Sequence, residues 1–250
     1  MSRSGPPRSC WRRDAAFTLA GLALLLAWDA SGLDRAVAHA VGGGAQGFPW
    51  RDAWVTRSLL HDGGRWASAL VLTGLVIGLL RRQGGGQGGA TASPPVTWAA
   101  LGMVLLNLLL VPGVKRSSST SCPWDLAEFG GTAHFVTHWN FGVFDGGPGH
   151  CFPSGHAVAA FAFIAMYFAW REARPGLARA WLFGALAAGA LFGAAQVLRG
   201  AHFVSHVAWS AWACWTLPAA ADALSRVRRR RPLPPAGVAA SGSPALPRRV

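Results

Sequence analysis

Six apolar stretches, joined by polar connections, constrain the fold of this 250-residue chain more than any other feature of its sequence. They are Ala15–Trp28, Trp66–Leu80, Val96–Val114, His156–Trp170, Ala180–Leu198 and Val207–Leu224. A helix needs roughly 20 apolar residues to cross a bilayer, so the first two stretches need flanking residues to complete a crossing. Because 52% of the residues are hydrophobic and 13% are charged, the sequence predicts an all-α domain with a bundle of six transmembrane helices.

The placement of arginine predicts the orientation of these helices. Arginines precede the first stretch and follow the second, fourth and sixth, which puts them all on one side of a six-helix arrangement. They are Arg3, Arg8, Arg12, Arg13, Arg81, Arg82, Arg171, Arg174, Arg179, Arg226 and Arg228 to Arg231. That side is expected to be cytoplasmic, with both termini, and the regions 30–65, 115–155 and 199–206 are expected outside. A cleaved signal peptide is the alternative for the first stretch, but no clear small-x-small site follows it.

Three parts of the chain follow from this pattern. We expect a cytoplasmic N-terminal segment at 1–14, the membrane domain at 15–225, and a basic, proline-rich cytoplasmic tail at 226–250. Residues 83–95, rich in glycine and small polar residues, are typical of a flexible linker. The net charge of +13 lies at segment ends and in the tail, a pattern that favours anionic lipid headgroups and argues against nucleic acid as a partner.

Lys115 is the first candidate for chemistry, because every other member of the 23 lysine and arginine residues is an arginine. Its ammonium group is a compact point charge, suited to a phosphate oxygen. It stands where an apolar stretch ends, next to Arg116. The alternative is that Lys115 is a snorkelling anchor at the membrane edge.

Two further segments lie on the expected outer side. The segment 151–156, Cys-Phe-Pro-Ser-Gly-His, opens the fourth stretch. A helix start leaves backbone N–H groups free for an anion, and Ser154 and His156 would face the same space; a simple N-cap is the alternative. The segment 196–206 contains His202 and His206, four residues apart and therefore on one helix face. A zinc pair is disfavoured, because no glutamate base or third ligand is evident.

These segments together resemble the type-2 phosphatidic acid phosphatase superfamily, membrane lipid phosphatases related in fold to vanadium-dependent haloperoxidases. The family pattern has a lysine, six residues and Arg-Pro; then Pro-Ser-Gly-His; then Ser-Arg, five residues, histidine, three residues and aspartate. Lys115 and the intact Pro-Ser-Gly-His match, and His202 fits the second histidine. The resemblance covers roughly residues 96–224.

Three positions depart from the pattern. Cys122 replaces an arginine, Gln196 replaces the arginine of the third motif, and His206 replaces the aspartate; Arg199 lies close enough to supply a guanidinium. The chain is similar to a bacterial subgroup with Cys-Pro-Trp-Asp and Arg-Gly-Ala-His-Phe-x-Ser-His, so we interpret the departures as a coherent variant.

The resemblance implies phosphoryl transfer through a phosphohistidine, with no metal or cofactor. His202 would attack phosphorus, and His156 would act as general acid and then general base. His206 or Asp125 would orient the nucleophile; in an alternative registration His206 is itself the reactive histidine. The groups expected to hold the phosphate are Lys115, Ser154, Gly155 and Arg199, with Arg116, Gln196 and His150 as further candidates.

The function expected from the resemblance is hydrolysis of a lipid phosphate at the periplasmic face of a bacterial inner membrane. The substrate would be lipid A, undecaprenyl diphosphate or a phosphatidate-type lipid, and no obligate protein partner is inferred. Two alternatives remain open. One is a lipid phosphotransferase, and the other is a catalytically silent protein that binds lipid phosphate, which the three departures favour.

The cysteines add one expectation. Cys122 and Cys151 fall in the same outer region, within the first motif and directly before the second, where an oxidising periplasm would permit a disulfide. Cys10 and Cys214 are expected to be reduced. The glycine-rich, aromatic stretch 130–149 between the first two motifs is expected to form a lid or a headgroup-selecting surface. An ordered loop with interfacial aromatic residues is the alternative.

Overall fold

The computed structural model describes residues 9–84 and 94–230, and these residues form helices, turns and loops without a β-strand. Long helices make up the body. They are α1 (Ser9–Ser31), α3 (Gly63–Gly84), α4 (Pro94–Arg116), α7 (Pro175–Leu198), α8 (Val204–Arg230) and the consecutive α5 (Gly155–Phe161), η5 (Ala162–Ile164) and α6 (Ala165–Trp170). The short elements are α2 (Leu33–Val41), η1 (Gly44–Gln46), the π-helical η2 (Val55–Asp62), η3 (Pro123–Asp125) and η4 (Ala127–Phe129).

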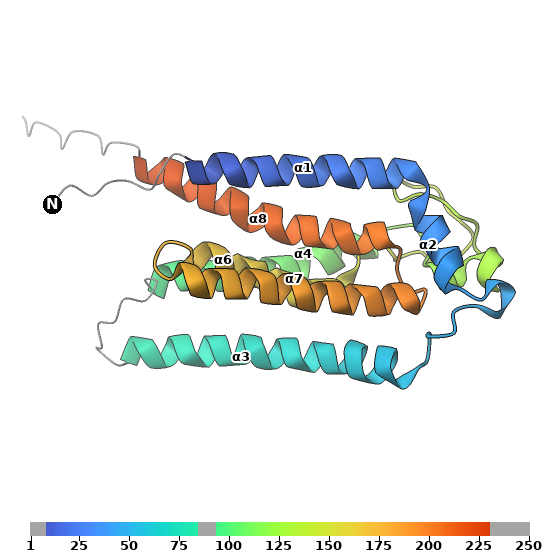
Figure 1. The fold of residues 1–250 in the computed structure, drawn as a ribbon, viewed down its shortest axis with the longest axis horizontal. Coiled ribbons are helices and arrows are strands. Elements are labelled where there is room, and N and C mark those ends of the chain that lie inside the picture. Colours follow the sequence, from blue (N-terminus) through green and yellow to red (C-terminus); the bar gives the residue numbers. More distant parts are fainter. Residues whose placement is uncertain (1–8, 85–93, 231–250) are drawn as a thin grey trace, which may run out of the picture.

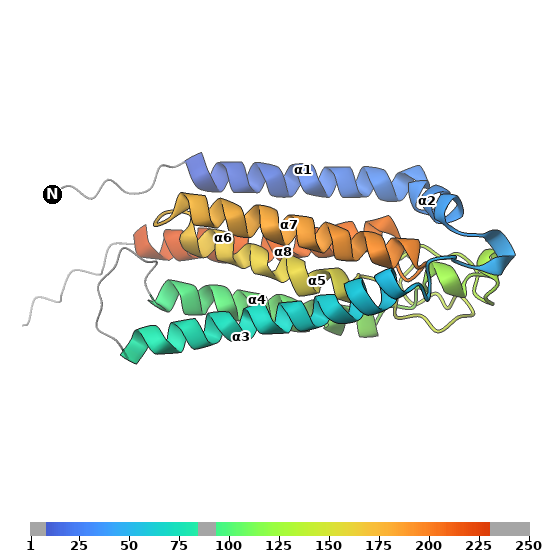
Figure 2. The same ribbon diagram turned by 60° about the horizontal axis from the view of Figure 1, so that its bottom comes forward.

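The long helices lie side by side along one direction (Figures 1 and 2). The start of α1, the end of α3 and the end of α8 share one end of the molecule, which we call the inner end. The opposite outer end carries α2 and the connections 42–62 and 117–154. The α5–η5–α6 segment is the core of the bundle, where Val158, Ile164 and Met166 are fully buried.

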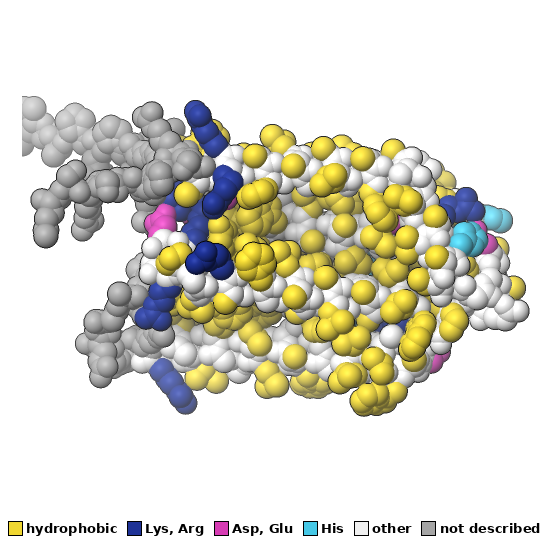
Figure 3. Space-filling view, in the orientation of Figure 1, with side chains coloured by type: hydrophobic (Ala, Val, Ile, Leu, Met, Phe, Trp, Pro, Cys, Tyr) yellow, Lys and Arg dark blue, Asp and Glu magenta, His cyan; other side chains and the backbone are white. Residues whose placement is uncertain are grey.

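Four helices are long and apolar enough to cross a membrane, which indicates a membrane protein. They are Cys10–Ser31, Val55–Arg81, Val96–Arg116 and Pro175–Leu198, while Gly155–Trp170 is apolar but shorter. Hydrophobic side chains cover the body between a basic end and an end with histidine and acidic residues (Figure 3). The helices that contain the first two predicted stretches include flanking residues and so reach the length that a crossing requires, as expected. Six crossings and a periplasmic outer end remain predictions.

Several helices extend beyond the segment boundaries expected from the sequence. Helix α1 begins at Ser9, inside the segment predicted as 1–14, and α8 continues to Arg230, five residues into the predicted tail. The region 30–65 is not an open loop, since it contains α2, η1 and η2. Residues 83 and 84 of the predicted linker 83–95 belong to α3, and residues 94 and 95 belong to α4. The rest of this linker, like most of the predicted tail, lies outside the described residues.

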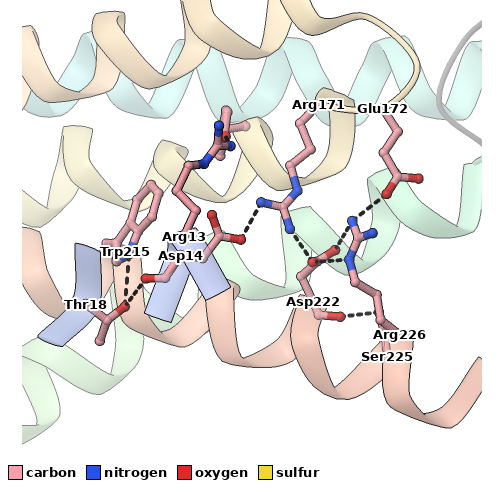
Figure 4. Close-up of polar contacts among 10 residues, drawn as sticks. Arg13, Asp14, Thr18, Arg171, Glu172, Trp215, Asp222, Ser225 and Arg226 are labelled. Atoms are coloured by element: carbon pink, nitrogen blue, oxygen red, sulfur yellow. Dashed lines mark hydrogen bonds and ion pairs between the residues drawn. The ribbon is translucent and has the colours of Figure 1, made fainter. Parts of the chain in front are cut away.

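A network of buried charges joins three helices at the inner end (Figure 4). Arg171, directly after α6, donates to Asp14 on α1 at 2.6 Å and also pairs with Asp222 on α8. Arg226 bonds the same Asp222 at 2.6 Å and pairs with Glu172. The side chains of Arg171 and Asp14 are each 6% exposed. A buried charge is tolerated when it is paired in this way, so the network ties α1 to the core of the bundle.

Candidate active site

Backbone contacts join the three motif segments at the outer end. Cys151 N–H donates to Thr120 O at 2.9 Å, Trp124 N–H donates to Gly200 O at 2.9 Å, and Ser154 N–H donates to His206 O at 3.1 Å. Each bond links two different motifs. A disulfide between Cys122 and Cys151 also connects the first motif to the second, while Cys10 and Cys214 are free thiols. The segments that carry the chemistry therefore form one connected unit.

The turn between α7 and α8 depends on Gly200. Its φ is +70°, a conformation that residues with a Cβ rarely adopt. A Cβ there would also overlap the ring of Phe48, which is 5% exposed. This turn fixes the relative positions of Arg199 and His202, and it seats the 48–62 connection over them.

Lys115 reaches the site from the last turn of α4. Its aliphatic stem lies beside Gly155, where a Cβ would come within 3.7 Å of the Lys115 Cδ atom. Its positive charge acts on the ring of His202. The neighbouring Arg116 is exposed. Of the two adjacent cations, the structure brings only Lys115 into the site.

Arg199 is 8% exposed and lies where the sequence suggested a replacement guanidinium. Its Nε donates to the carbonyl oxygen of Arg51 at 2.8 Å, and its Nη1 lies 3.4 Å from Oε1 of Gln196. Trp124 contacts the same guanidinium at 5.8 Å from its ring centre. Burial lowers the pKa of Arg199, but an arginine stays protonated in proteins. Gln196 thus positions Arg199 and leaves its own buried Nε2 without a partner.

His202 is 4% exposed and lies between the disulfide and Lys115. Burial moves the pKa of its imidazole well below 6.5, the Lys115 charge adds to this effect, and a hydrogen bond with the Cys151 backbone opposes it. Its Nδ1 is 3.6 Å from Cys151 Sγ. The ring is therefore neutral near pH 7, which is the state a nucleophile requires.

His156 is held by the connection that precedes α3. Its Nε2 lies 3.2 Å from the carbonyl oxygen of Leu60, and its ring stacks on that of His61 with centroids 4.4 Å apart. His61 Nδ1 is in turn 2.9 Å from Asp62 Oδ1. Sequence reasoning missed this contribution, because a π-helical segment some 95 residues upstream leaves no local signal beside the motif.

Several polar atoms around these side chains are buried and have no hydrogen-bond partner among the described residues. They include Ser154 Oγ and Gln196 Nε2, while Ser154 is 0% exposed. An unsatisfied buried donor is costly, so such groups usually have a ligand or another partner in the working state. His206 also belongs to this group. Its backbone carbonyl anchors Ser154 and Ser210, and its Nδ1 is buried with no partner.

Other candidates lie elsewhere. Asp125 accepts hydrogen bonds from Cys122 N–H at 3.3 Å and Trp124 Nε1 at 3.0 Å, so it caps η3 and does not contact His202. Burial raises the pKa of Asp125, and these bonds oppose the rise. The side chain of His150 is exposed, since its backbone has φ +55° and bonds Ser118, so it does not enter the site.

The stretch 130–149 behaves as an ordered loop in its interior. Asp145 is 3% exposed and accepts bonds from Ser121 N–H, Ser121 Oγ and Gly147 N–H. At the same time Phe141 and Phe144 are 82% and 77% exposed. The carboxylate organises the loop backbone, and the two aromatic rings are presented at the outer end.

One group of metal-ligand atoms gathers at the site. One ligand atom each of Cys122, Cys151 and His202 lie within 4.8 Å of one another. Because the two sulfur atoms are bonded to each other, neither is the thiolate that a metal ion requires. This group does not fit a metal centre in the disulfide form.

The charge balance is the most informative property of the site. Lys115 and Arg199 converge with Ser154, His156 and His202, and in residues 9–84 and 94–230 neither cation forms an ion pair with a carboxylate. Buried cations without anionic partners are expensive. An arrangement of this kind can bind a phosphate group and stabilise the negative charge of a transferring phosphoryl group.

Comparison with known proteins agrees with this geometry. No curated protein and no solved structure gave a significant match. The profile of the PAP2 superfamily matches residues 96–229, more than half of the chain and all three motif segments. Members of that superfamily are phosphatases that act on phosphate esters, and the chain belongs to the PAP2 superfamily.

Proposed function

We propose that the protein is an integral membrane phosphatase that hydrolyses a lipid phosphate at its outer end through a phosphohistidine. The observation that carries this proposal is that buried Arg199, half-buried Lys115 and unpartnered donors gather around His202 and His156. No carboxylate among the described residues forms an ion pair with either cation. Family membership supports the phosphatase chemistry. The apolar body supports a substrate that reaches the site from the bilayer.

In the first step, a ring nitrogen of neutral His202 attacks phosphorus. A nitrogen–phosphorus bond forms as the bond to the ester oxygen breaks, and the leaving oxygen takes a proton from the ring of His156, which the bound phosphate anion keeps protonated in the substrate complex. Lys115, Arg199, Ser154 Oγ and the Gly155 amide neutralise the remaining phosphate oxygens.

In the second step, His156 accepts a proton from water as the water oxygen attacks phosphorus. The nitrogen–phosphorus bond breaks, inorganic phosphate leaves, and His202 is again neutral. No metal is needed for either step, because the positive charge that stabilises the transition state comes from side chains. The proposed periplasmic location rests on the arginines of the inner end, such as Arg81 and Arg171.

The test is phosphate release by purified protein in detergent with EDTA, from a panel of dioleoyl phosphatidate, lipid A and undecaprenyl diphosphate. We expect release from at least one lipid, and a loss of at least about 10⁴-fold for His202→Ala. A radiolabelled substrate should leave an acid-labile, base-stable label on the wild-type chain only. Transfer of the label to a lipid hydroxyl in place of water would identify a phosphotransferase.

A silent lipid-phosphate binder is the second candidate. It is favoured by Cys122, which is consumed in a disulfide and offers no charge where the family has arginine. Folded protein that binds phosphatidate vesicles but releases no phosphate from any lipid in the panel would support this alternative and reject the phosphatase.

A further inference from the structure

The family pattern places an aspartate at the position of His206, so the carboxylate that supports the nucleophile must come from elsewhere or be absent. The nearby carboxylates are mostly engaged in other contacts. Asp34 Oδ1 accepts from Trp28 Nε1 at 2.8 Å and from Ser205 N–H at 2.9 Å, Asp125 caps η3, and Asp145 organises the 121–147 loop. Within the described part of the chain, none of these three carboxylates forms a hydrogen bond or an ion pair with His202 or His206.

Asp29, at the outer end of α1, is linked to His206 by one intervening side chain. Its side chain is 6% exposed, and its Oδ2 accepts hydrogen bonds from Trp139 Nε1 at 3.0 Å and Trp209 Nε1 at 2.9 Å. The same oxygen lies 3.3 Å from Nε2 of His138, whose side chain is 7% exposed, at ion-pair distance but without the geometry of a hydrogen bond. Its Oδ1 is buried with no partner. Asp29 lies outside residues 96–229, the part of the chain that the family profile matches.

His138 connects this carboxylate to the site. Its ring stacks on Phe152, two residues before Ser154, with centroids 4.0 Å apart and planes 4° apart. Its edge meets the ring of His206 at 5.7 Å between centroids, and His206 meets His202 at 5.9 Å. Asp29, His138, His206 and His202 therefore form a continuous line of buried groups from α1 to the proposed nucleophile.

We propose that Asp29, acting through His138 and His206, is the positioning carboxylate for His202. The inference rests on the proposed function. When His202 attacks phosphorus its ring gains positive charge, and a carboxylate at the end of the line stabilises that charge across a water-poor interior. The stack on Phe152 holds the ring of His138 between Asp29 and His206. It touches no substrate atom, so its role is to position and to supply charge.

The first test is Asp29→Asn, which keeps an oxygen for both tryptophan donors and removes the charge. With dioleoyl phosphatidate in mixed micelles, or the best substrate of the panel, we expect kcat to fall about 10- to 100-fold, as for other outer-shell partners. KM should change less than about threefold, because the phosphate ligands are intact. The matched control is Trp139→Phe, which removes one hydrogen bond to the same carboxylate and leaves its charge.

A purely structural role predicts a different result. If Asp29 only held the loop, Trp139→Phe and Asp29→Asn would lower thermal stability and kcat in parallel. The proposal instead requires that Asp29→Asn lowers kcat much more than Trp139→Phe does at matched stability. Equal effects would overturn it.

Two further variants guard against misfolding as an explanation. His138→Phe keeps the stack on Phe152 but removes both ring nitrogens, and it should lower kcat as Asp29→Asn does. His206→Asp restores the family carboxylate, so adding Asp29→Asn to it should cause no further loss and should relieve repulsion between two buried carboxylates. If Asp29→Asn lowered kcat as much in the His206→Asp variant as in the wild type, the proposed line of groups from Asp29 to His202 would be contradicted.

The outcomes separate this inference from the proposed function. No phosphate release by the wild type rejects the phosphatase itself. Wild-type activity together with an unchanged kcat for Asp29→Asn leaves the phosphatase standing and rejects Asp29 as its positioning residue.

Discussion

The two ends of the bundle use buried charge in opposite ways. At the inner end, Arg171 and Arg226 are matched by Asp14, Asp222 and Glu172 within about one hydrogen-bond length. At the outer end, Lys115 and Arg199 converge on two histidines, and no carboxylate among the described residues pairs with either of them. Matched charges hold helices together, whereas unmatched cations retain their capacity to bind an anion.

The outer end compensates for its unmatched charges with other contacts. The backbone bonds between motif segments, the Gly200 turn and the Cys122–Cys151 disulfide hold the cations in place without neutralising them. The rigidity of the site therefore comes from neutral and covalent links, and its electrostatic potential is preserved for the substrate.

The largest expected effect comes from a substitution that removes ion pairs at the inner end. Arg171→Met leaves two buried carboxylates short of a partner, which typically costs about 3–5 kcal/mol. We expect Tm in detergent to fall by roughly 6–20 °C, with unchanged turnover per folded molecule below the new Tm. Arg81→Gln, an exposed arginine at the same end, is the control and should shift Tm little. A large loss of turnover with intact stability would show that the inner network acts on the site.

The second substitution removes a cation at the outer end. It should lower activity without lowering thermal stability. Lys115→Met removes one stabilising charge from the transition state, so kcat/KM should fall about 10²- to 10³-fold. Because the lost cation has no anionic partner, Tm should stay the same or rise. The measurement is phosphate release beside scanning fluorimetry. Arg116→Gln removes an equal charge from the next residue; if it were as inactive as Lys115→Met, the assignment of Lys115 would be wrong.

A smaller effect is expected from removal of the disulfide, which tests how much this covalent link contributes to holding the site together. Replacing Cys122 and Cys151 by serine opens a link between residues 29 positions apart, for which chain entropy gives about 3–4 kcal/mol, and measured values are often lower. We expect a lower Tm and reduced turnover, because Cys151 lies against His202. Wild-type protein treated with a reductant should behave like the double variant. If the reductant changed neither the Tm nor the turnover of the wild type, the backbone contacts alone would be enough to hold the site in place.

Much of the site could be predicted because its residues occur in compact motifs. Pro-Ser-Gly-His, the single lysine and the Gly-Ala-His turn are short and lie at helix ends, so the residues predicted family membership, which is confirmed. Asp125 and His150 make local contacts, and their roles at the site stay predictions. Proximity in sequence to a motif does not decide the direction of a side chain, and both are used locally, one as a helix cap and one as an exposed turn residue.

The contributions of α1 and of the 48–62 connection could not be predicted in this way. Asp29, His138 and His61 carry no motif, and they reach the site across more than 60 residues of chain. An ionisable residue at the end of an apolar stretch is a general signal for function. This signal marks Asp29 as a candidate functional residue, but it does not show which residue Asp29 contacts.

The sequence by itself determined the membrane character, the order of the apolar helices and the residue types of the phosphate site, because hydropathy and short motifs are local properties of the chain. Only the tertiary structure decided which charges are matched. Which of the described carboxylates pairs with Arg171, and whether any of them pairs with Lys115, depends on how distant helices pack. The energy of a buried charge is set by its neighbours in space, and a linear pattern does not contain them.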